Sequence, residues 1–305
     1  MEEIKCILCN TDSSKIVIQE NGYCGKQCSC SLIFISPRPR IEEIIDIYGH
    51  GQANISAESH IGGSFLKRLY AKHTLRILKK FIKKGNLLEI GSGGGYFLDE
   101  ARKAGFEPHG IELNPVQANY ITNNLKIACD QKPLSSNSFD NKMFDVIYHS
   151  DVISHFHDPI AEFRTMYKKL NPNGLIIFET GNIGDIDSKY YKLFTRFQYP
   201  DHLFFFGEQN LEQLLALTGF TITKISRYSI ILQLFWLRFL HTIRKSTSSN
   251  NIQSPNSKIE KKYSFKKIIK NIYYLFLYCL RYIVGWILPK YKRPQTLIVV
   301  AHKII

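Results

Sequence analysis

The sequence is poor in acidic residues, and the shortage is concentrated in one region. The 305 residues include 40 Lys or Arg and 26 Asp or Glu, which gives a formal net charge of +14. The range 230–294 holds thirteen of the basic residues and one acidic residue, Glu260, so it carries +12 of that charge. The basic character therefore belongs to one segment and is not a property of the whole chain.

A secretory signal and an even number of cysteines are also lacking. The first residues, Met1 to Lys5, do not show a basic region followed by an apolar one. The seven cysteines are an odd number, and five of them lie at positions 6, 9, 24, 28 and 30. An odd count without an export signal argues for reduced thiols, so we expect a cytoplasmic protein whose clustered cysteines bind a metal.

The glycine-rich stretch at 87–98 lacks the features of two common phosphate-binding loops. The fingerprint Gly-x-Gly-x-x-Gly would need glycine where Tyr96 stands, and no Gly-Lys-Ser/Thr follows. Instead, an apolar run containing Glu89 leads into glycines at 91, 93, 94 and 95, and helical spacing begins at Phe97. This pattern indicates a buried strand, a tight turn and a helix start. Because glycines allow close approach and a helix N-terminus offers free N–H groups, it predicts a nucleotide-binding loop.

Glu112 ends the next strand pattern, where a carboxylate can accept both hydroxyls of a ribose. Together with the glycine loop, this motif resembles class I S-adenosylmethionine-dependent methyltransferases. The resemblance implies that the loop lies beneath the amino-acid and ribose parts of the cofactor and that Glu112 binds the ribose. It also places Asp130 against the adenine amine, although a turn-forming aspartate is an equal alternative. The cofactor-binding residues implied are Glu89, Ile90, Gly91, Ser92, Gly93, Gly95, Tyr96, Glu112, Leu113, Asn114, Asp130 and Ser150.

Two short-spaced cysteine pairs lie near the N-terminus, Cys6 with Cys9 and Cys28 with Cys30. Two such pairs can form a tetrahedral zinc site that holds together a segment too small for its own core. The segment resembles the N-terminus of methyltransferases that modify sugars or cell-surface glycans. Those proteins carry two Cys-x-x-Cys pairs, a glycine after the second pair, and a Pro-Arg-Pro element. Here the second pair is Cys-x-Cys, Ser31 replaces the glycine, and Cys24 is a further candidate. A metal-free knuckle is the alternative.

Strand and helix patterns alternate after the glycine loop. We expect strands near 86–91, 107–112, 125–129, 144–149, 174–180, 219–225 and 295–301, and helices near 65–81, 96–104, 115–123, 159–170 and 211–217. This rhythm predicts an α/β fold with a Rossmann-like seven-stranded methyltransferase sheet and helices on both faces. We expect a zinc-knuckle segment and a short helix in 1–50, and the methyltransferase domain in 51–305. The last strand follows late, so 230–294 is an insertion before it.

Histidines in two places are candidates for acid–base chemistry. The stretch 144–159 resembles the fourth-strand motif of the family, so His149, Ser150 and Asp151 should face the cofactor. His155 occupies the position of a histidine in that family motif. We favour a positioning role for His155 over a catalytic one. His202 lies in an aromatic loop, 181–207, that in the family covers the acceptor. Since histidine has an unperturbed pKa of about 6.5, His202 is the best candidate for a base, with a bridging role in the loop as the alternative.

The insertion has apolar runs at 230–240 and 272–288, flanked by lysines, and a polar stretch at 246–262 that we expect to be disordered. A single membrane-spanning helix would place the last strand on the opposite side of the bilayer from the sheet that it completes. We therefore expect helices that lie at an anionic membrane surface. Helices packed on protein are the alternative. Nucleic acid is a weaker interpretation, because the lysines flank an apolar helix.

We therefore expect an S-adenosylmethionine-dependent methyltransferase with a structural zinc ion. Its acceptor would be an oxygen, and less favourably a carbon, of a saccharide or lipid-linked glycan. It would act in the cytoplasm, peripherally at the inner face of the cell membrane. The alternatives are a methyltransferase of RNA or protein and a cofactor-binding scaffold without activity. No Asn/Asp-Pro-Pro-Tyr/Phe element follows the fourth strand, which disfavours adenine or amide N-methylation.

Overall fold

A seven-stranded sheet forms the centre of the computed structural model, which describes residues 1–43, 61, 64–135, 137–140, 142–247 and 260–304. The strand order is β10-β11-β8-β7-β4-β5-β6. In chain order the strands are β4 (Gly85–Ile90), β5 (Phe106–Ile111), β6 (Ala128–Asp130), β7 (Phe144–Ser150), β8 (Leu170–Gly181), β10 (Phe220–Ser229) and β11 (Gln295–Lys303). The strands β4 to β8 pair with one another in parallel, whereas β11 is antiparallel to both β8 and the edge strand β10. The predicted Rossmann-like methyltransferase sheet is confirmed.

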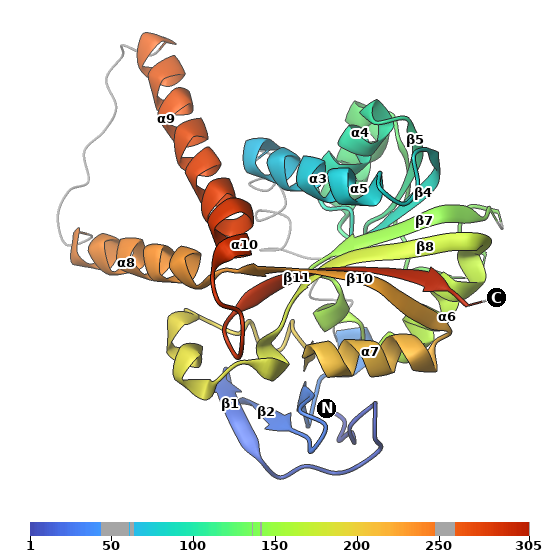
Figure 1. Cartoon of the computed structure of the whole chain (residues 1–305), viewed down its shortest axis with the longest axis vertical. Helices are drawn as coiled ribbons and strands as arrows, with labels where there is room; N and C mark the ends of the chain where they lie inside the picture. The colour runs from blue at the N-terminus through green and yellow to red at the C-terminus, as the bar shows by residue number, and fades with distance from the viewer. Residues whose placement is uncertain (44–60, 62–63, 136, 141, 248–259, 305) are drawn as a thin grey trace.

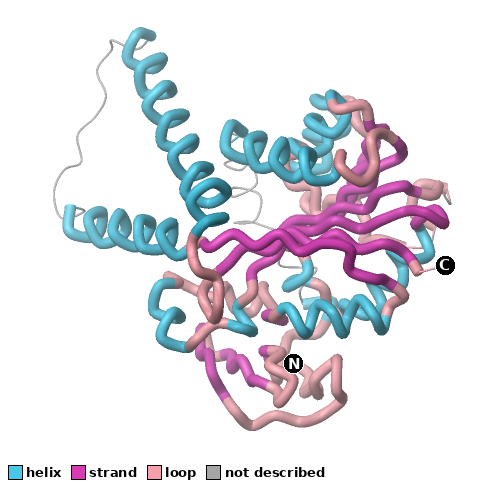
Figure 2. The backbone as a smooth tube through the Cα atoms, viewed as in Figure 1, coloured by secondary structure: helices cyan, strands magenta, loops and turns pink. Residues whose placement is uncertain are grey.

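Helices cover both faces of this sheet (Figures 1 and 2). One face carries α3 (Ser64–Leu78), α4 (Tyr96–Lys103) and α5 (Pro115–Tyr120), and the other carries α6 (Pro159–Lys169) and α7 (Glu208–Leu217). The central strands are apolar on both faces, because each face must be buried beneath a helix layer. Leu87 and Ile177, for example, belong to the core cluster under α3 and α4, whereas Leu88 and Ile176 belong to the cluster under α6 and α7.

The third parallel strand begins later than the sequence suggests. β6 covers Ala128–Asp130, whereas we expected 125–129, because α5 continues into a π-helical turn, η1 (Ile121–Leu125). This turn packs on the glycine loop: a Cβ atom at Gly95 would lie 2.7 Å from Leu125 and 2.8 Å from Ile121. Packing of these two apolar side chains therefore favours a helical turn over the strand start that the sequence pattern predicts at 125.

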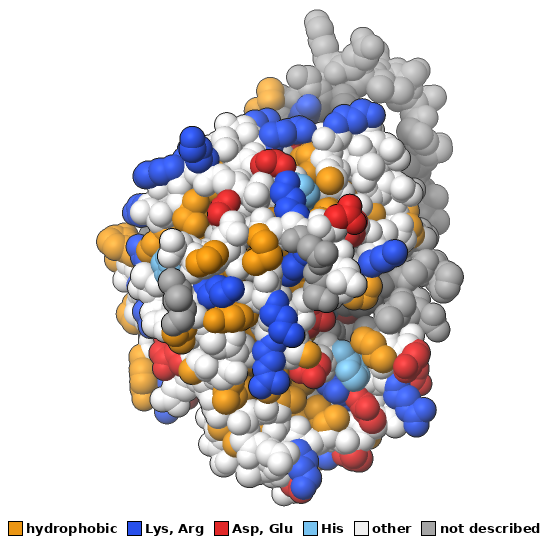
Figure 3. Space-filling model, turned by 90° about the vertical axis from the view of Figure 1, so that its right-hand side faces the viewer, with side chains coloured by type: hydrophobic (Ala, Val, Ile, Leu, Met, Phe, Trp, Pro, Cys, Tyr) orange, Lys and Arg blue, Asp and Glu red, His pale blue; other side chains and the backbone are white. Residues whose placement is uncertain are grey.

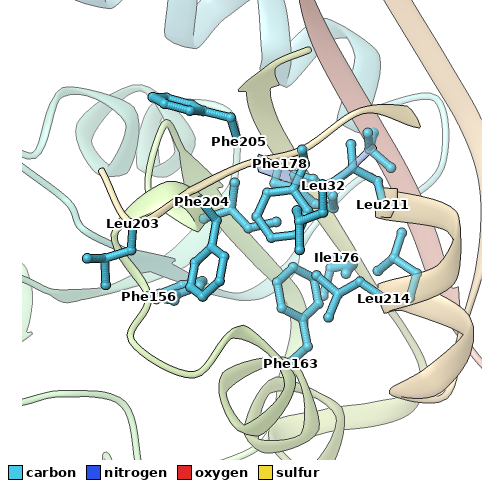
Figure 4. Packing of buried hydrophobic residues seen from close by; sticks show 14 of the residues in the cluster. Leu32, Phe156, Phe163, Ile176, Phe178, Leu203, Phe204, Phe205, Leu211 and Leu214 are labelled. Carbon is cyan, nitrogen blue, oxygen red and sulfur yellow. The ribbon is translucent and has the colours of Figure 1, made fainter. Parts of the chain in front are cut away.

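The N-terminal segment shares a sheet with a distant part of the chain. β1 (Ile16–Glu20), β2 (Tyr23–Gln27) and β3 (Ile33–Ile35) form a four-stranded antiparallel sheet with β9 (Phe204–Phe205). Figure 4 shows Leu32 packed among Phe178, Phe204 and Leu211, in the core under α7. The segment thus obtains its core from the aromatic loop. The range 44–60, which includes most of the expected short helix at 41–48, lies outside the described residues.

The insertion lies between β10 and β11, as predicted. It contains α8 (Ile231–Thr247) and α9 (Glu260–Tyr278), and α9 continues through a π-helical turn, η5 (Cys279–Val284), into α10 (Gly285–Ile287). Figure 1 shows α9 pointing away from the sheet. Both ends of the insertion meet, because the Ile230 N–H donates to the Pro294 carbonyl at 3.0 Å. Within the ranges described, no helix combines the length and apolar character needed to cross a membrane. Most of the expected polar stretch, 248–259, is outside the described residues.

Candidate functional site

The glycine loop follows β4 at the carboxyl end of the central strands. Gly91, Gly93 and Gly95 have φ values of 69°, 53° and 69°, which other residues rarely adopt. A Cβ atom at Gly91 would lie 2.6 Å from the Val152 side chain. Dihedrals and close packing therefore both require glycine at position 91. Ser92 fixes the turn, since its hydroxyl donates to the Glu89 carbonyl at 3.1 Å.

Glu112 ties this loop to the end of β5. Its carboxylate accepts the Gly93 N–H at 2.7 Å and the Asn114 N–H at 2.9 Å. Asn114 caps α5, because its side-chain oxygen accepts the N–H groups of Val116 and Gln117. Burial raises the pKa of Glu112, although the backbone N–H groups oppose that shift. The predicted ribose-binding carboxylate thus stands at a strand end, held by backbone amides.

Glu89 is a buried carboxylate beside the loop. It is 5% exposed, and its Oε2 has no hydrogen-bond partner among the described residues. Burial and the neighbouring Glu112 charge raise the pKa of Glu89 well above its usual range. An unpaired buried carboxylate oxygen is costly unless a donor satisfies it, so the site suits a ligand with N–H or O–H groups.

Lys67 on α3 was missed by the sequence reasoning. Its ammonium interacts electrostatically with both Glu89 and Glu112, so α3 brings a cation to the two carboxylates. Next to it, Arg68 lies over the Tyr96 ring at 5.2 Å, and the Tyr96 hydroxyl donates to the Ile61 carbonyl. The amphipathic helix predicted at 65–81 could have revealed Lys67, because Lys67 is one of the polar side chains near the start of that helix.

The remaining predicted cofactor residues lie along the same edge of the sheet. Ile90 ends β4, and Leu113 follows Glu112 after β5. Asp130 ends β6, where its carbonyl accepts the Glu112 N–H at 3.1 Å. Ser150 ends β7 beside Glu179 of β8. Because β4 to β7 are parallel, their carboxyl ends bring these residues into one region.

The prediction that His149 faces this region is wrong. His149 is fully buried, and its ring stacks on Phe178 with centroids 4.9 Å apart. Phe156 and Phe163 pack edge-on against it. The strand alternates sides, so His149 points into the core under α6, and burial lowers its pKa to about 3.

A cavity of about 400 Å³ lies next to the β7 and β8 ends, under the aromatic loop. Its walls combine polar residues from the strand ends with aromatic rings from the loop: Asp151, Ser154, His155, Thr180, Gly181, Ile183, Phe194, Arg196, Phe197, Gln198, His202, Phe204, Phe205 and Phe206. A concave site with apolar walls and a few polar groups is typical of small-molecule binding.

His155 and His202, the two predicted catalytic residues, come together at this cavity. Their ring centroids are 4.5 Å apart, and His155 Nδ1 lies 3.1 Å from Asp201 Oδ1. The ligand atoms of His155, Asp201 and His202 all lie within 4.8 Å of one another. Burial and the adjacent His155 lower the pKa of His202 to about 4, so its imidazole is neutral at pH 7. A neutral imidazole beside a second, carboxylate-bound imidazole can accept and pass on a proton.

The four predicted metal ligands also converge. The sulfur atoms of Cys6, Cys9, Cys28 and Cys30 all lie within 4.8 Å of one another, with Sγ–Sγ distances of 3.6 Å for Cys6–Cys30 and 3.1 Å for Cys9–Cys28. Tetrahedral zinc with Zn–S bonds of about 2.3 Å separates its sulfur ligands by about 3.8 Å, which this cluster approaches. Cys24 is outside the cluster. Ser31, with φ of 71°, adopts the dihedral that glycine would favour at this position.

Comparisons with known proteins agree with this architecture. A family model described as a methyltransferase domain matches residues 63–225, more than half of the chain. The sequence is similar to phosphoethanolamine N-methyltransferase 1 of Arabidopsis thaliana, with 30% identity over 119 residues. That match covers 34% of this chain and 23% of the plant protein, so the chain spans about a quarter of that relative's length.

Solved structures are also similar to this chain. A Galdieria sulphuraria protein assigned as a sarcosine dimethylglycine methyltransferase gives a TM-score of 0.50 at 14% identity, over 78% of this chain and 85% of that chain. A SAM-dependent methyltransferase from Archaeoglobus fulgidus gives a TM-score of 0.49 at 18% identity, over 77% and 93%.

Proposed function

This chain belongs to the methyltransferase family, and we propose that it is an enzyme that transfers methyl groups from S-adenosylmethionine bound at its glycine loop. The observation that carries this proposal is the pair of buried carboxylates at adjacent strand ends. Glu112, held by hydrogen bonds from backbone N–H groups, would accept hydrogen bonds from the ribose hydroxyls. Glu89 has a buried carboxylate oxygen with no hydrogen-bond donor among the described residues. When bound, this cofactor supplies an electrophilic methyl group on a sulfonium. Gly93, where an added Cβ atom would meet nothing within 4 Å, would leave room for it, and Asp130 and Ser150 would lie beside it.

The acceptor is a hydroxyl of a saccharide or lipid-linked glycan, and it binds in the cavity under the aromatic loop. Phe194, Phe197 and Phe205 offer flat apolar faces, while Thr180 and Gln198 offer hydrogen bonds. Such a mixture suits a ring that carries hydroxyl groups. The similarity of the N-terminal segment to glycan-modifying methyltransferases supports the same substrate class.

His202 acts as the base that removes the acceptor's proton. Its lowered pKa keeps it unprotonated at neutral pH, and it lines the cavity. Asp201 and His155 form the hydrogen-bonded pair that supports it. The protein's contribution is then alignment of the acceptor oxygen and removal of its proton.

Cys6, Cys9, Cys28 and Cys30 bind a structural zinc ion. Four protein ligands leave no open position, so the metal's role is to hold the knuckle together. Because β3 pairs with β9, the metal also stabilises the aromatic loop from outside the cavity.

The insertion rests on an anionic membrane surface at the inner face of the cell membrane. Thirteen of the twenty exposed large hydrophobic side chains in the described part of the chain lie between 231 and 291, among them Phe235, Phe239 and Trp286. Exposed cations such as Lys267 and Lys270 accompany them on α9. By contrast, the face away from α8 and α9 shows basic, acidic and hydrophobic side chains interspersed (Figure 3). Apolar and basic side chains on the same helices favour lipid over a protein partner.

A second candidate acceptor is a small phosphorylated amine. The Arabidopsis relative is named for phosphoethanolamine, and Arg196 brings a guanidinium to the cavity. A guanidinium pairs well with phosphate.

Methyl transfer from labelled S-adenosylmethionine tests these acceptors. The full-length protein is incubated in parallel with bacterial glycolipid extract, nucleotide sugars and phosphoethanolamine. Label in the glycolipid or sugar fraction supports the leading proposal, and release of that label as methyl iodide on treatment with hot hydriodic acid identifies O-methylation. Label in phosphoethanolamine alone would replace the glycan acceptor by the second candidate.

Vesicle flotation tests the membrane surface. Binding is expected to phosphatidylglycerol vesicles and not to phosphatidylcholine vesicles, and F235D/F239D on α8 is expected to abolish it. Leu217→Asp is the matched control, because Leu217 is 49% exposed on α7, outside the insertion. Unchanged flotation of F235D/F239D would refute the lipid contact.

A further inference from the structure

The insertion reaches the ends of the central strands through Arg281 and Tyr282 of η5. Arg281 Nη2 lies 2.5 Å from Glu179 Oε1, and the Tyr282 hydroxyl donates to the two Glu179 oxygens at 3.2 and 3.1 Å. Glu179 lies near the carboxyl end of β8 and is 3% exposed. A buried carboxylate needs a counter-charge and donors, and here the insertion supplies both.

Glu179 in turn supports the turn at 150–152, which lies between the glycine loop and the cavity. The Glu179 carbonyl accepts the Asp151 N–H at 2.9 Å, and Ser150 is paired with Glu179 across β7 and β8. On one side of the turn, Val152 packs against Gly91. On the other side, Asp151 lines the cavity and holds a positive φ of 54°. Such a backbone conformation persists only where its surroundings fix it.

The Arg281 guanidinium is itself tightly held. It lies over the rings of Tyr70 and Tyr282 at 4.8 and 5.5 Å, and His73 stacks on Tyr282 with centroids 3.9 Å apart. Cation–π contacts of a desolvated guanidinium add to its ion pair. The residues that hold Arg281 thus come from α3, β8 and η5, elements far apart in the sequence.

Asp151 also experiences the charge of Arg281. The ionisable groups that act on it are Arg281 from η5, His155 from η2 (Ile153–His155), Glu179 from β8 and Tyr148 from β7. Desolvation by the surrounding protein raises the pKa of Asp151, although the residue is partly open to solvent, whereas Arg281 and His155 oppose the shift. Removing Arg281 would therefore leave Glu179 without its cation and make Asp151 easier to protonate.

We propose that Arg281 is a positioning residue of the active site: by fixing Glu179 it holds the 150–152 turn, so that cofactor binding depends on the docking of η5 onto the sheet. The inference rests on the proposed function, because it takes the glycine loop as the cofactor site. It also makes the insertion part of the active site, beyond any role at a membrane surface.

Calorimetric titration with S-adenosylhomocysteine tests this inference on the full-length chain. Arg281→Met is expected to weaken binding about ten-fold or more, because small displacements of a positioned group have large effects. Arg281→Lys, which keeps the charge, should recover most of the affinity. The matched control is Arg238→Met, which removes an exposed cation of the same insertion on α8 and should bind like the wild type.

A double variant separates positioning from stability. E179M/R281M replaces the ion pair by two apolar side chains, so no unpaired charge is buried and the thermal midpoint should return toward that of the wild type. Its affinity for S-adenosylhomocysteine is expected to stay about ten-fold low, because the Arg281–Glu179 pair that holds the 150–152 turn is gone. This variant also decides the matter if Arg281→Met does not fold.

Three outcomes would overturn the inference. Wild-type affinity of Arg281→Met would show that Arg281 does not support the site. Wild-type affinity of E179M/R281M would reduce the ion pair to a structural element. In both cases the proposed function stands, whereas absence of binding by the wild type would overturn the proposed function and the inference together.

Discussion

The cofactor side and the acceptor side of this site are built from different kinds of sequence. The cofactor side comes from one continuous region, in which β4, the glycine loop and β5 bring Glu89, Gly93 and Glu112 together within 24 residues. The acceptor side combines the aromatic loop with the N-terminal knuckle, which it contacts through β9. The insertion reaches the 150–152 turn between the two sides through Arg281 and Glu179. Local motifs can therefore specify the first side, whereas only long-range packing assembles the second.

This difference predicts that damage to one side leaves the other intact. Glu112→Ala should produce the largest effect, because it removes the acceptor of two backbone N–H groups and the proposed ribose ligand. We expect the affinity for S-adenosylhomocysteine, measured by calorimetry, to fall about 100-fold or more, as hydrogen bonds to a charged group contribute about 1.5–3 kcal/mol each. Glu107→Ala is the control on the same strand, since Glu107 is exposed and pairs with Lys142 away from the loop. Equal losses in both variants would contradict a specific role for Glu112.

His202→Gln should act only on the acceptor side. Loss of a general base typically lowers kcat about 100-fold or more, so we expect that drop with an unchanged affinity for S-adenosylhomocysteine. Because the pKa of His202 is lowered to about 4, wild-type kcat should stay level from pH 8 to about pH 5 and fall only as the pH approaches 4, where the base becomes protonated. His302→Asn, which removes an imidazole on β11, is the control. A wild-type kcat in His202→Gln would return His202 to a bridging role in the loop.

Removal of the knuckle ligands should disturb the acceptor side from a distance. Cys9→Ser/Cys28→Ser is expected to lose bound zinc, measured by elemental analysis, and to lower the thermal midpoint by several degrees, because the metal links the two cysteine turns of the knuckle. Cys24→Ser should keep both, since Cys24 lies outside the four-sulfur cluster. If the purified wild type contains less than one zinc ion per chain after growth with zinc, the metal-free knuckle is correct.

The smallest effect should come from His149, which belongs to neither side. Its folded pKa of about 3 lies below the unfolded value of about 6.5, so the unfolded chain binds more protons between these values and stability falls as the pH decreases from about 6.5. His149→Phe removes this dependence at one site. The loss of stability between pH 7 and pH 5, measured by denaturant unfolding, should shrink by about 1–2 kcal/mol in the variant. The pKa of His73 is also lowered, to about 4, so His73 still contributes to the pH dependence of stability. Some loss of stability at low pH should therefore remain in the variant.

Much of the fold and part of the site could be predicted from local pattern. Alternating strand and helix signals predicted the strands and helices of the domain in chain order, and the glycine spacing with Glu112 predicted the strand-end motif that the backbone amides complete. The π-helical turn at Ile121–Leu125 and the buried position of His149 were not predictable in this way. In both cases the deciding interactions are with residues distant in sequence, the glycine loop for Leu125 and Phe178 for His149.

The sequence by itself determined the alternation of strands and helices, the glycine loop and the family resemblance, because each depends on periodicity and spacing within about thirty residues. Tertiary structure alone decided that Lys67 approaches the two carboxylates, that β9 joins the N-terminal sheet, and that the insertion supplies a buried cation to Glu179. The physical reason is that charge pairing and edge pairing depend on distance in space. The insertion, which its composition presents as a separate basic segment, is joined by Arg281 to the strand ends where the site lies.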